Sequence, residues 1–427
     1  MKLTVLPSGH GDCLLLESAR KRMLIDGGVS KAFREKVLPL LARTNDRPID
    51  CLYVSHIDND HLGGLIVLVD ALYDWRVYSF RKGKKPAPKK PAVPQPPDLL
   101  KIWHNVFSDL LEENADPVAA ALAHTATIFS GLGRTAGTDA KVRDYHDNLA
   151  EGAKEAIRLS YRVGAEQLGV KVNPEYRGGL MYLTQKRRPA LKHGKATFTL
   201  IGPRAEDLDK LRLEWNEWLE KHKALVNGLR RTAGSDAGEL TSAADLVAPL
   251  ELEARTLVDR LATPDLAARA DELGKRGKVT TPNLASLMFL VEEGRQSLLL
   301  TGDGHATDII AGLKERGKLR RDGTLHVNVL KVPHHGAEYN TTIDFARDVT
   351  ADHYVFCGNG FQGNPEPVVL DTIAKQRAAA PFTFWFNSTP SHNAHMKDIA
   401  ALTKKIARKN PGFKAVFSDQ PFDVPFA

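Results

Sequence analysis

Cysteine and long apolar runs are both scarce in this sequence. Only three cysteines, Cys13, Cys51 and Cys357, occur in 427 residues. They lack the CxxC spacing and the even number typical of a disulfide framework, so we interpret them as buried thiols. No window approaches the roughly 18 apolar residues of a membrane span, and the apolar N-terminus is too short for a signal peptide. These absences predict a cytoplasmic protein with no membrane partner.

Charge of a single sign is also limited. The formal net charge is only +7, and the sequence is 42% hydrophobic and 26% charged. This balance is typical of a globular protein, either one large domain with insertions or two to three ordinary domains. The small positive excess mildly favours a polyanionic partner such as nucleic acid, although a few basic loops would account for it equally well.

The densest group of metal-ligand residue types follows the apolar run 51–54, which predicts a short buried strand. The group comprises four potential ligands within six residues, namely His56, Asp58, Asp60 and His61. A single His-x-Asp pair in a loop is usually a satisfied surface group. Here the residues are dense and flanked by glycine, so we predict that all four bind metal.

Later predicted strands also end in ligand-type residues. Asp303 follows the second strand of a predicted hairpin at 287–301, and the pair His334-His335 follows the strand 327–332. Strand ends of an α/β sheet meet at one edge, so these residues are expected to join the first group there. The result would be three histidines and three carboxylates, enough for two metals bridged by Asp303 and a water. We favour His335 as ligand and His334 as the residue that faces substrate phosphate or acts as acid.

The charge of such a site favours a particular substrate class. Two divalent cations against three carboxylates leave a positive balance, which suits the anionic oxygen of a phosphodiester. Asp60, Asp303 and His334 are then the candidate catalytic residues, acting with a bridging hydroxide. The oxygen ligand Asp58 makes manganese or magnesium a competitor of zinc.

Other polar residues near these motifs have simpler explanations. We expect His305, His392 and His395 to lie at the surface or behind the ligands. Asp12 and Asp26 each stand beside a glycine, and we expect them to brace turns under the site rather than bind metal.

Composition divides the chain into five parts. Residues 1–75 have a β-β-β-α-β pattern, and 76–190 hold a basic, proline-rich loop and a helical insert that begins at Asp98. A strand at 191–204 and a second helical insert at 205–277 follow, and in 278–427 strands and helices alternate. Six basic residues lie between 81 and 90. Among them, Lys84 and Lys85 are candidate contacts to a phosphate backbone, and a solvated linker is the alternative.

Taken together, three motifs resemble the signature of metallo-β-lactamase-fold hydrolases, and the ComEC-like branch of competence nuclease domains in particular. They are Ser-His-Ile-Asp-Asn-Asp-His-Leu-Gly-Gly at 55–64, Leu-Leu-Thr-Gly-Asp at 299–303 and Leu-Lys-Val-Pro-His-His-Gly at 330–336. The resemblance extends over about 1–75 and 280–375. It implies an α/β protein with an αββα sandwich and a dinuclear site at one edge, interrupted here by two helical insertions.

The resemblance also implies how the ligands are shared between two divalent ions, Zn²⁺ or Mn²⁺ with Mg²⁺ as an alternative. One ion would be held by His56, Asp58 and Asp303, and the other by Asp60, His61, Asp303 and His335.

Two departures stand out. The middle histidine that the wider superfamily has after the strand at 196–201 is missing, and Asn364 stands where ComEC-like domains have Gly-His-Pro-His. Asn364 cannot act as a general acid, so we place it and Asn359 among substrate-binding residues. The acid is then His334, metal-bound water or an insert residue.

These observations favour a metal-dependent phosphodiesterase, specifically a nuclease acting on DNA or RNA. One alternative is a phosphodiesterase or esterase for a small ligand, such as a cyclic nucleotide or a lipid phosphate. Another is a metal-stabilised interaction module without activity. The helical inserts are candidate contacts to a protein partner or to a second copy of the chain.

Overall fold

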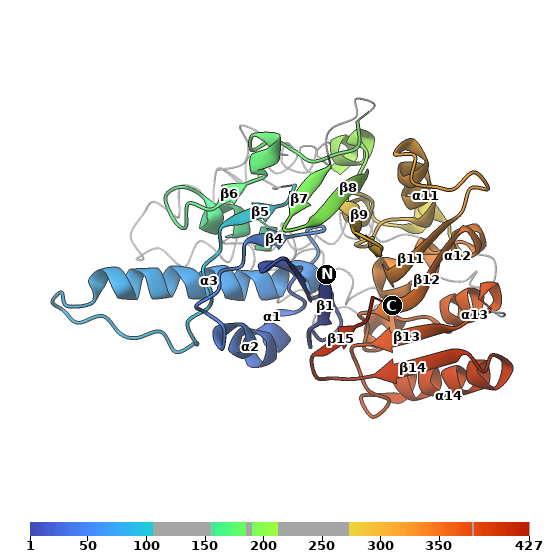
Figure 1. The fold of residues 1–427 in the computed structure, drawn as a ribbon. Helices are drawn as coiled ribbons and strands as arrows, with labels where there is room; N and C mark the ends of the chain where they lie inside the picture. The colour runs from blue at the N-terminus through green and yellow to red at the C-terminus, as the bar shows by residue number, and fades with distance from the viewer. Residues whose placement is uncertain (106–154, 157, 185–189, 212–272, 378–379, 427) are drawn as a thin grey trace, which may run out of the picture.

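The computed structural model describes residues 1–105, 155–156, 158–184, 190–211, 273–377 and 380–426 (Figure 1). The helices predicted for most of the two inserts, and the partner contacts assigned to them, fall outside these residues. Within the described residues, no helix combines the length and the apolar character needed to cross a membrane.

Two β-sheets make up the centre of the fold. The first sheet has seven strands, in the order β15 (Phe422–Val424), β1 (Lys2–Val5), β2 (Leu14–Ser18), β3 (Lys21–Ile25), β4 (Cys51–Tyr53), β5 (Lys101–Trp103) and β6 (Lys171–Val172). The second has eight, in the order β14 (Phe413–Phe417), β13 (Phe382–Phe386), β12 (Val349–Phe356), β11 (Leu325–Lys331), β10 (Gln296–Leu300), β9 (Met288–Glu293), β8 (Ala196–Gly202) and β7 (Leu191–His193).

Each sheet is mixed. Strands β3, β4 and β5 run parallel, and so do β10 through β14, whereas the hairpins β1–β2–β3 and β7–β8–β9–β10 are antiparallel. Because parallel strands point the same way, the loops after β4, β5, β10, β11 and β12 leave from corresponding ends of their sheets. Four of these five loops carry residues predicted for the site.

Three apolar layers explain why two sheets form. The alternation in β10 is clear: Leu298 and Leu300 pack between the sheets, while Leu299 faces the helices outside. A strand buried on both faces needs apolar residues at every position, which is the pattern of a sandwich covered by helices. The layers form an αββα sandwich, as the sequence predicted.

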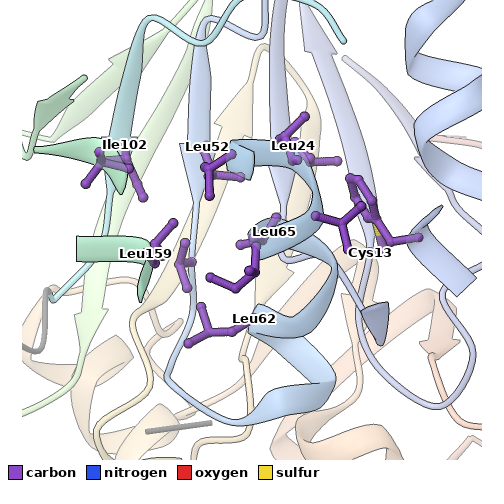
Figure 2. Packing of buried hydrophobic residues seen from close by; sticks show 14 of the residues in the cluster. Cys13, Leu24, Leu52, Leu62, Leu65, Ile102 and Leu159 are labelled. Atoms are coloured by element: carbon purple, nitrogen blue, oxygen red, sulfur yellow. The ribbon is translucent and has the colours of Figure 1, made fainter. Parts of the chain in front are cut away.

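Helices cover the outer faces of both sheets. The first sheet is covered by α3 (Asn59–Arg81) and by the helical segment α1 (Ser30–Ala32), η1 (Phe33–Val37) and α2 (Leu38–Ala42). Figure 2 shows Leu62 and Leu65 of α3 facing Leu24 and Leu52 of the sheet. The second sheet packs against α11 (Ala306–Glu315), α12 (Ile343–Asp348), α13 (Pro367–Gln376) and α14 (Ala394–Lys409).

Several predictions from sequence are confirmed. The three cysteines are free and buried, and the hairpin expected at 287–301 is β9 and β10, with Gly294 in the turn at φ +61°. The β-β-β-α-β order at the start of the chain is also present.

The helix predicted to begin at Asp98 is wrong at its start. Lys101–Trp103 form strand β5, in which Ile102 and Trp103 pair with Leu52 and Tyr53 of β4. The apolar spacing there fits a helix, but the inter-sheet layer has room for a large ring. Trp103 fills it, fully buried and edge-on to Phe198 at 5.3 Å between ring centroids.

We expect the Trp103→Ala variant to lose about 3–5 kcal/mol of unfolding free energy, because a buried aromatic ring would leave a cavity between the sheets. Urea denaturation measures the change. The control is Leu100→Ala on the same segment, whose side chain is 49% exposed and whose loss should change stability by less than about 0.5 kcal/mol. Equal destabilisation by both variants would contradict this account of β5.

Candidate metal centre

The first turn of α3 carries two of the predicted ligands. Asp58 is the N-cap of the helix, and Asp60 and His61 are buried in its first turn. Glycines allow this end of the helix to lie very close to neighbouring loops. A Cβ on Gly64 would come within 2.1 Å of the Gly27 carbonyl oxygen, and a Cβ on Gly11 would come within 1.7 Å of the Asp60 backbone carbonyl oxygen. Side chains at these positions would push the ligands out of place.

Two carboxylates stand behind the imidazoles and orient them. Asp26 contacts His61 Nδ1 at 2.9 Å, and Asp12 contacts His335 Nδ1 at 3.1 Å. Each ring therefore turns its other nitrogen, Nε2, toward the interior of the site. This carboxylate–histidine arrangement is the usual support for a histidine that binds metal.

Asp303 lies where the two rings converge. Its Oδ1 is 3.4 Å from His61 Nε2, and its Oδ2 is 3.5 Å from His335 Nε2. His335 Nε2 is also 3.1 Å from Asp60 Oδ2. Asp303 follows β10 directly, and its backbone N–H donates to the Ser286 hydroxyl at 3.1 Å, which fixes the start of the loop.

Two further predicted residues, His56 and His334, lie near the same Asp303 oxygen as His335. His56 Nε2 lies 3.8 Å from Asp303 Oδ2 and 3.6 Å from Asp58 Oδ2. His334 Nε2 lies 3.5 Å from the same Asp303 oxygen. The structure therefore brings the other five predicted metal ligands, and His334, close to the carboxylate of Asp303.

His334 and His335 occupy a tight turn after β11. Both have positive φ, 47° and 55°, a conformation that non-glycine residues adopt at a cost and that clusters at functional sites. Their environments differ: the side chain of His335 is 3% exposed and that of His334 is 24% exposed. His334 Nδ1 contacts the Asn340 side-chain oxygen at 2.8 Å. The two rings lie equally far from Asp303, so distance does not show which of them is the ligand. The greater exposure of His334 places it at the solvent-facing opening of the site, which we call the mouth.

The electrostatics of the site are dominated by buried negative charge. Asp12, Asp26, Asp58, Asp60 and Asp303 are all buried, and the described chain sets one ammonium group against them. Lys331 is buried, and its Nζ is 2.5 Å from Asp12 and 3.4 Å from Asp303. The five carboxylates and Lys331 leave four net negative charges, which two divalent cations would neutralise.

The pKa values reflect this excess of negative charge. Burial disfavours an imidazolium, yet Asp303 and Asp12 outweigh burial and raise the pKa of His335 to about 9. Asp303 and Asp26 likewise raise the pKa of His61 well above its ordinary value, again against burial. Burial also opposes the charge of Asp12, but Lys331 and His335 lower its pKa to about 2. Asp12 and Asp303, whose pKa values are both lowered by neighbouring positive charge, therefore stay ionised and attract cations.

Several buried polar atoms have no hydrogen-bond partner here, among them His56 Nε2, His61 Nε2 and Asp58 Oδ1. Buried polar atoms normally have a partner, because desolvating them without one costs about 1–3 kcal/mol each. One ligand atom from each of Asp12, His61, Asp303 and His335 lies within 4.8 Å of the others. The donor set of imidazoles and carboxylates fits divalent cations such as Zn²⁺ and Mn²⁺.

The sequence predicts that Asp12 braces a turn under the site rather than binds metal, but the structure also makes it a candidate ligand. Its carboxylate belongs to the candidate metal group and contacts His335 and Lys331. Asp26 does brace a turn, since it accepts hydrogen bonds from the Ser55 N–H and hydroxyl at 2.8 and 2.7 Å, but it also contacts His61.

Sequence reasoning missed two residues altogether. Lys331 stands inside an apolar strand, and only the rarity of lysine in such runs could have marked it. His104 is buried at the end of β5, and burial lowers its pKa to about 4. It lines a small internal space together with Ser55 and His56. Its place directly after an unrecognised strand concealed it.

The predicted substrate-binding residues lie at different distances from the centre. Asn364 is buried in the loop after β12, where its backbone oxygen accepts from the Gly360 N–H at 2.8 Å. Asn359 is half-buried in the same loop. Lys84 and Lys85 are exposed beyond the far end of α3, and about 1.5 Å per residue over its 23 residues separates them from His61 by roughly 30 Å.

The three histidines that the sequence places at the surface or behind the ligands lie outside the metal-ligand cluster. His305 is fully buried, so of the two positions predicted for it the surface one is excluded, and its ring caps α11 by accepting from the Thr307 N–H. His392 is exposed, and His395 Nε2 contacts the Pro365 carbonyl oxygen at 2.9 Å.

Residues 6–129 match the family model of the metallo-beta-lactamase superfamily. The chain has the metallo-β-lactamase fold, with two mixed sheets between layers of helices. Proteins of this superfamily are mostly metallo-hydrolases, so the match supports a hydrolase with divalent metal. It does not distinguish the ComEC-like branch from others.

Two further comparisons were with solved structures and with curated proteins. The crystal structure of the metallo-beta-lactamase fold protein YhfI from Bacillus subtilis is similar over 99% of this chain and 100% of that chain, with 12% identity and a TM-score of 0.35. Likeness at this level does not bear on function. No curated protein matches the sequence.

We expect Asp26→Asn to weaken divalent-metal affinity about 10–100-fold, because the amide no longer fixes His61 by a charged contact. Competition with a chromophoric chelator measures the dissociation constant. Asp352→Asn is the matched control, since Asp352 contacts His326 at 3.1 Å outside the site. Equal affinities for wild type and Asp26→Asn would contradict the supporting role of Asp26.

Proposed function

We propose that this protein is a metal-dependent phosphodiesterase, and specifically a nuclease that acts on DNA or RNA. The observation that carries the proposal is the position of Asp303, whose two oxygens face His61 on one side and His56, His334 and His335 on the other. A carboxylate between two groups of imidazoles and carboxylates is suited to bridge two divalent ions.

The ligand sets that we propose are those that the family resemblance implies. His56, Asp58 and Asp303 would hold one ion, and Asp60, His61, Asp303 and His335 would hold the other. The missing middle histidine leaves the first set with fewer imidazoles than the second. Four net negative charges from the buried carboxylates and Lys331 support two ions rather than one, because a single dication would leave two negative charges uncompensated in a buried site.

The site carries less positive charge than the sequence predicts. Counting only Asp58, Asp60 and Asp303 against two dications gave a positive site, but Asp12, Asp26 and Lys331 make it neutral. A phosphodiester is still favoured over a dianionic monoester, because it adds one negative charge rather than two. Divalent ions held here supply Lewis-acid polarisation of a phosphoryl oxygen and a more acidic water.

The chain's own residues supply the remaining steps. Asp60 and Asp303 hold the reacting centre in place, and His334 is positioned at the mouth to move a proton. The contact of its Nδ1 with Asn340 leaves Nε2 directed toward Asp303 and any phosphate bound there. Burial lowers the pKa of His334 against the opposing effect of Asp303, which favours a neutral ring that can accept and return a proton.

The basic loop supports a polymeric substrate over a small one. Lys84 and Lys85 lie roughly 30 Å from the ligands along α3, so no cyclic nucleotide or lipid phosphate reaches both. A nucleic acid strand extended at about 3.4 Å per nucleotide would cover that distance in about ten nucleotides. In Figure 1 the long blue helix α3 projects beyond the sheets, with this loop at its outer end.

With Mn²⁺, Mg²⁺ or Zn²⁺, wild-type protein should cleave single- or double-stranded DNA or RNA, or bis-nitrophenyl phosphate. We expect Asp303→Asn and Asp60→Asn each to reduce the rate by at least about a hundredfold, because several kcal/mol of metal-dependent stabilisation are lost. Asp371→Asn, an acid on the outer helix α13, is the control. Cleavage of cyclic nucleotides alone would favour the small-ligand alternative. Bound metal with no turnover of any substrate would favour an interaction module.

The double variant Lys84→Gln/Lys85→Gln should weaken binding of an oligonucleotide of about 20 nucleotides and lower the slope of log affinity against log salt by up to about two. It should leave hydrolysis of bis-nitrophenyl phosphate unchanged. The matched control is Lys404→Gln/Lys405→Gln on α14, an exposed lysine pair on the outer face of the second sheet. Identical salt slopes for both double variants would assign the basic loop to a solvated linker.

A further inference from the structure

Two aromatic rings stack between loops that pack against the candidate metal centre, and they have no part in the steps above. His10 and Phe361 lie 4.2 Å apart between ring centroids, with their planes inclined by 26°. Phe361 is 37% exposed, although a phenyl ring normally contributes to stability by being buried. His10 comes from the loop between β1 and β2, and Phe361 from the loop after β12.

Both loops are attached to ligand-bearing segments. Gly11, next to His10, packs directly on the Asp60 backbone. On the other side, Pro365 packs against Gly336, the neighbour of His335, and the Glu366 N–H donates to the Gly336 oxygen at 3.0 Å. The stacked pair is therefore connected to the candidate centre through both of its members.

Hydrogen bonds hold the two loops in fixed conformations. The Phe361 N–H donates to the Asn359 side-chain oxygen at 3.0 Å, and Asn393 Nδ2 donates to the Asn359 carbonyl at 2.8 Å. Asn387 Nδ2 donates to the Gly9 oxygen at 3.3 Å, adjacent to His10. A ring on an ordered loop loses little conformational entropy when a ligand stacks on it.

We propose that the His10–Phe361 pair is a stacking subsite for a nucleobase attached to the phosphodiester at the metal centre. An exposed phenyl ring supported by a second ring offers a flat apolar face, which suits the π-face of any base. The acyl chain of a lipid phosphate would instead need an apolar channel. Asn359 and Asn364 of the same loop then lie beside the nucleoside, which gives the two predicted substrate-binding residues a common location.

This inference rests on the proposed phosphodiesterase activity, and its test separates the two. The substrates are the p-nitrophenyl ester of thymidine 5′-phosphate and methyl p-nitrophenyl phosphate, which share a leaving group and a charge and differ in the nucleoside. Wild type should favour the thymidine ester in kcat/KM by on the order of tenfold, mainly through KM, since stacking of one base has about this effect. Phe361→Leu should abolish the preference, and Phe361→Trp should keep it.

Phe80→Leu is the control, because Phe80 is 72% exposed at the far end of α3. A second measurement, binding of thymidine 5′-monophosphate to the metal-loaded protein, does not depend on turnover. Binding that is lost in Phe361→Leu and kept in Phe361→Trp supports the subsite even if neither ester is hydrolysed, and in that case only the proposed activity fails. Equal ester preference, or equal nucleotide binding, in wild type and Phe361→Leu overturns the subsite.

Discussion

The concentration of buried carboxylates around Asp303 is the constraint on which the rest of the site depends. Negative charge on five buried acids is mutually repulsive, and among the described residues Lys331 compensates only one of them. Such a group is stable only with cations in place or with protons on its histidines. Without metal, the negative charge of the carboxylates raises the pKa values of His61 and His335, so that protons on these rings offset it. A metal ion bound at this candidate site would thus contribute to the folding energetics of the region.

The carboxylates lie close together because the sandwich brings loops from its two sheets to one edge. Asp60 and His61 come from the first sheet and its helix, and Asp303 and His335 from the second. The layer between the sheets, with Trp103 against Phe198 and Phe289, fixes their separation. Rigid apolar packing therefore determines the distances between charged groups, so that the site is held in place by residues with no chemistry of their own.

How far the sequence predicts this protein depends on whether the signal is local. Four of the ligands lie within six residues of sequence, namely His56, Asp58, Asp60 and His61. Asp303 directly follows a clear hairpin, so its approach to them could be expected. The pairings of Asp12 with Lys331 and of Asp26 with His61 join distant segments and leave no periodic pattern. Strand β5 was mistaken for a helix because three residues with helical spacing carry no information about a parallel neighbour.

The pairing of β1 with β15 has a consequence for how the protein is made. Leu3 lies opposite Val424 in this ladder, so the first sheet is completed by a strand that leaves the ribosome after every other strand described here. Contacts between such distant segments form late and slowly. Asp12 is likewise synthesised long before its partners Lys331 and His335, and the nascent chain must carry it without them until those residues have emerged.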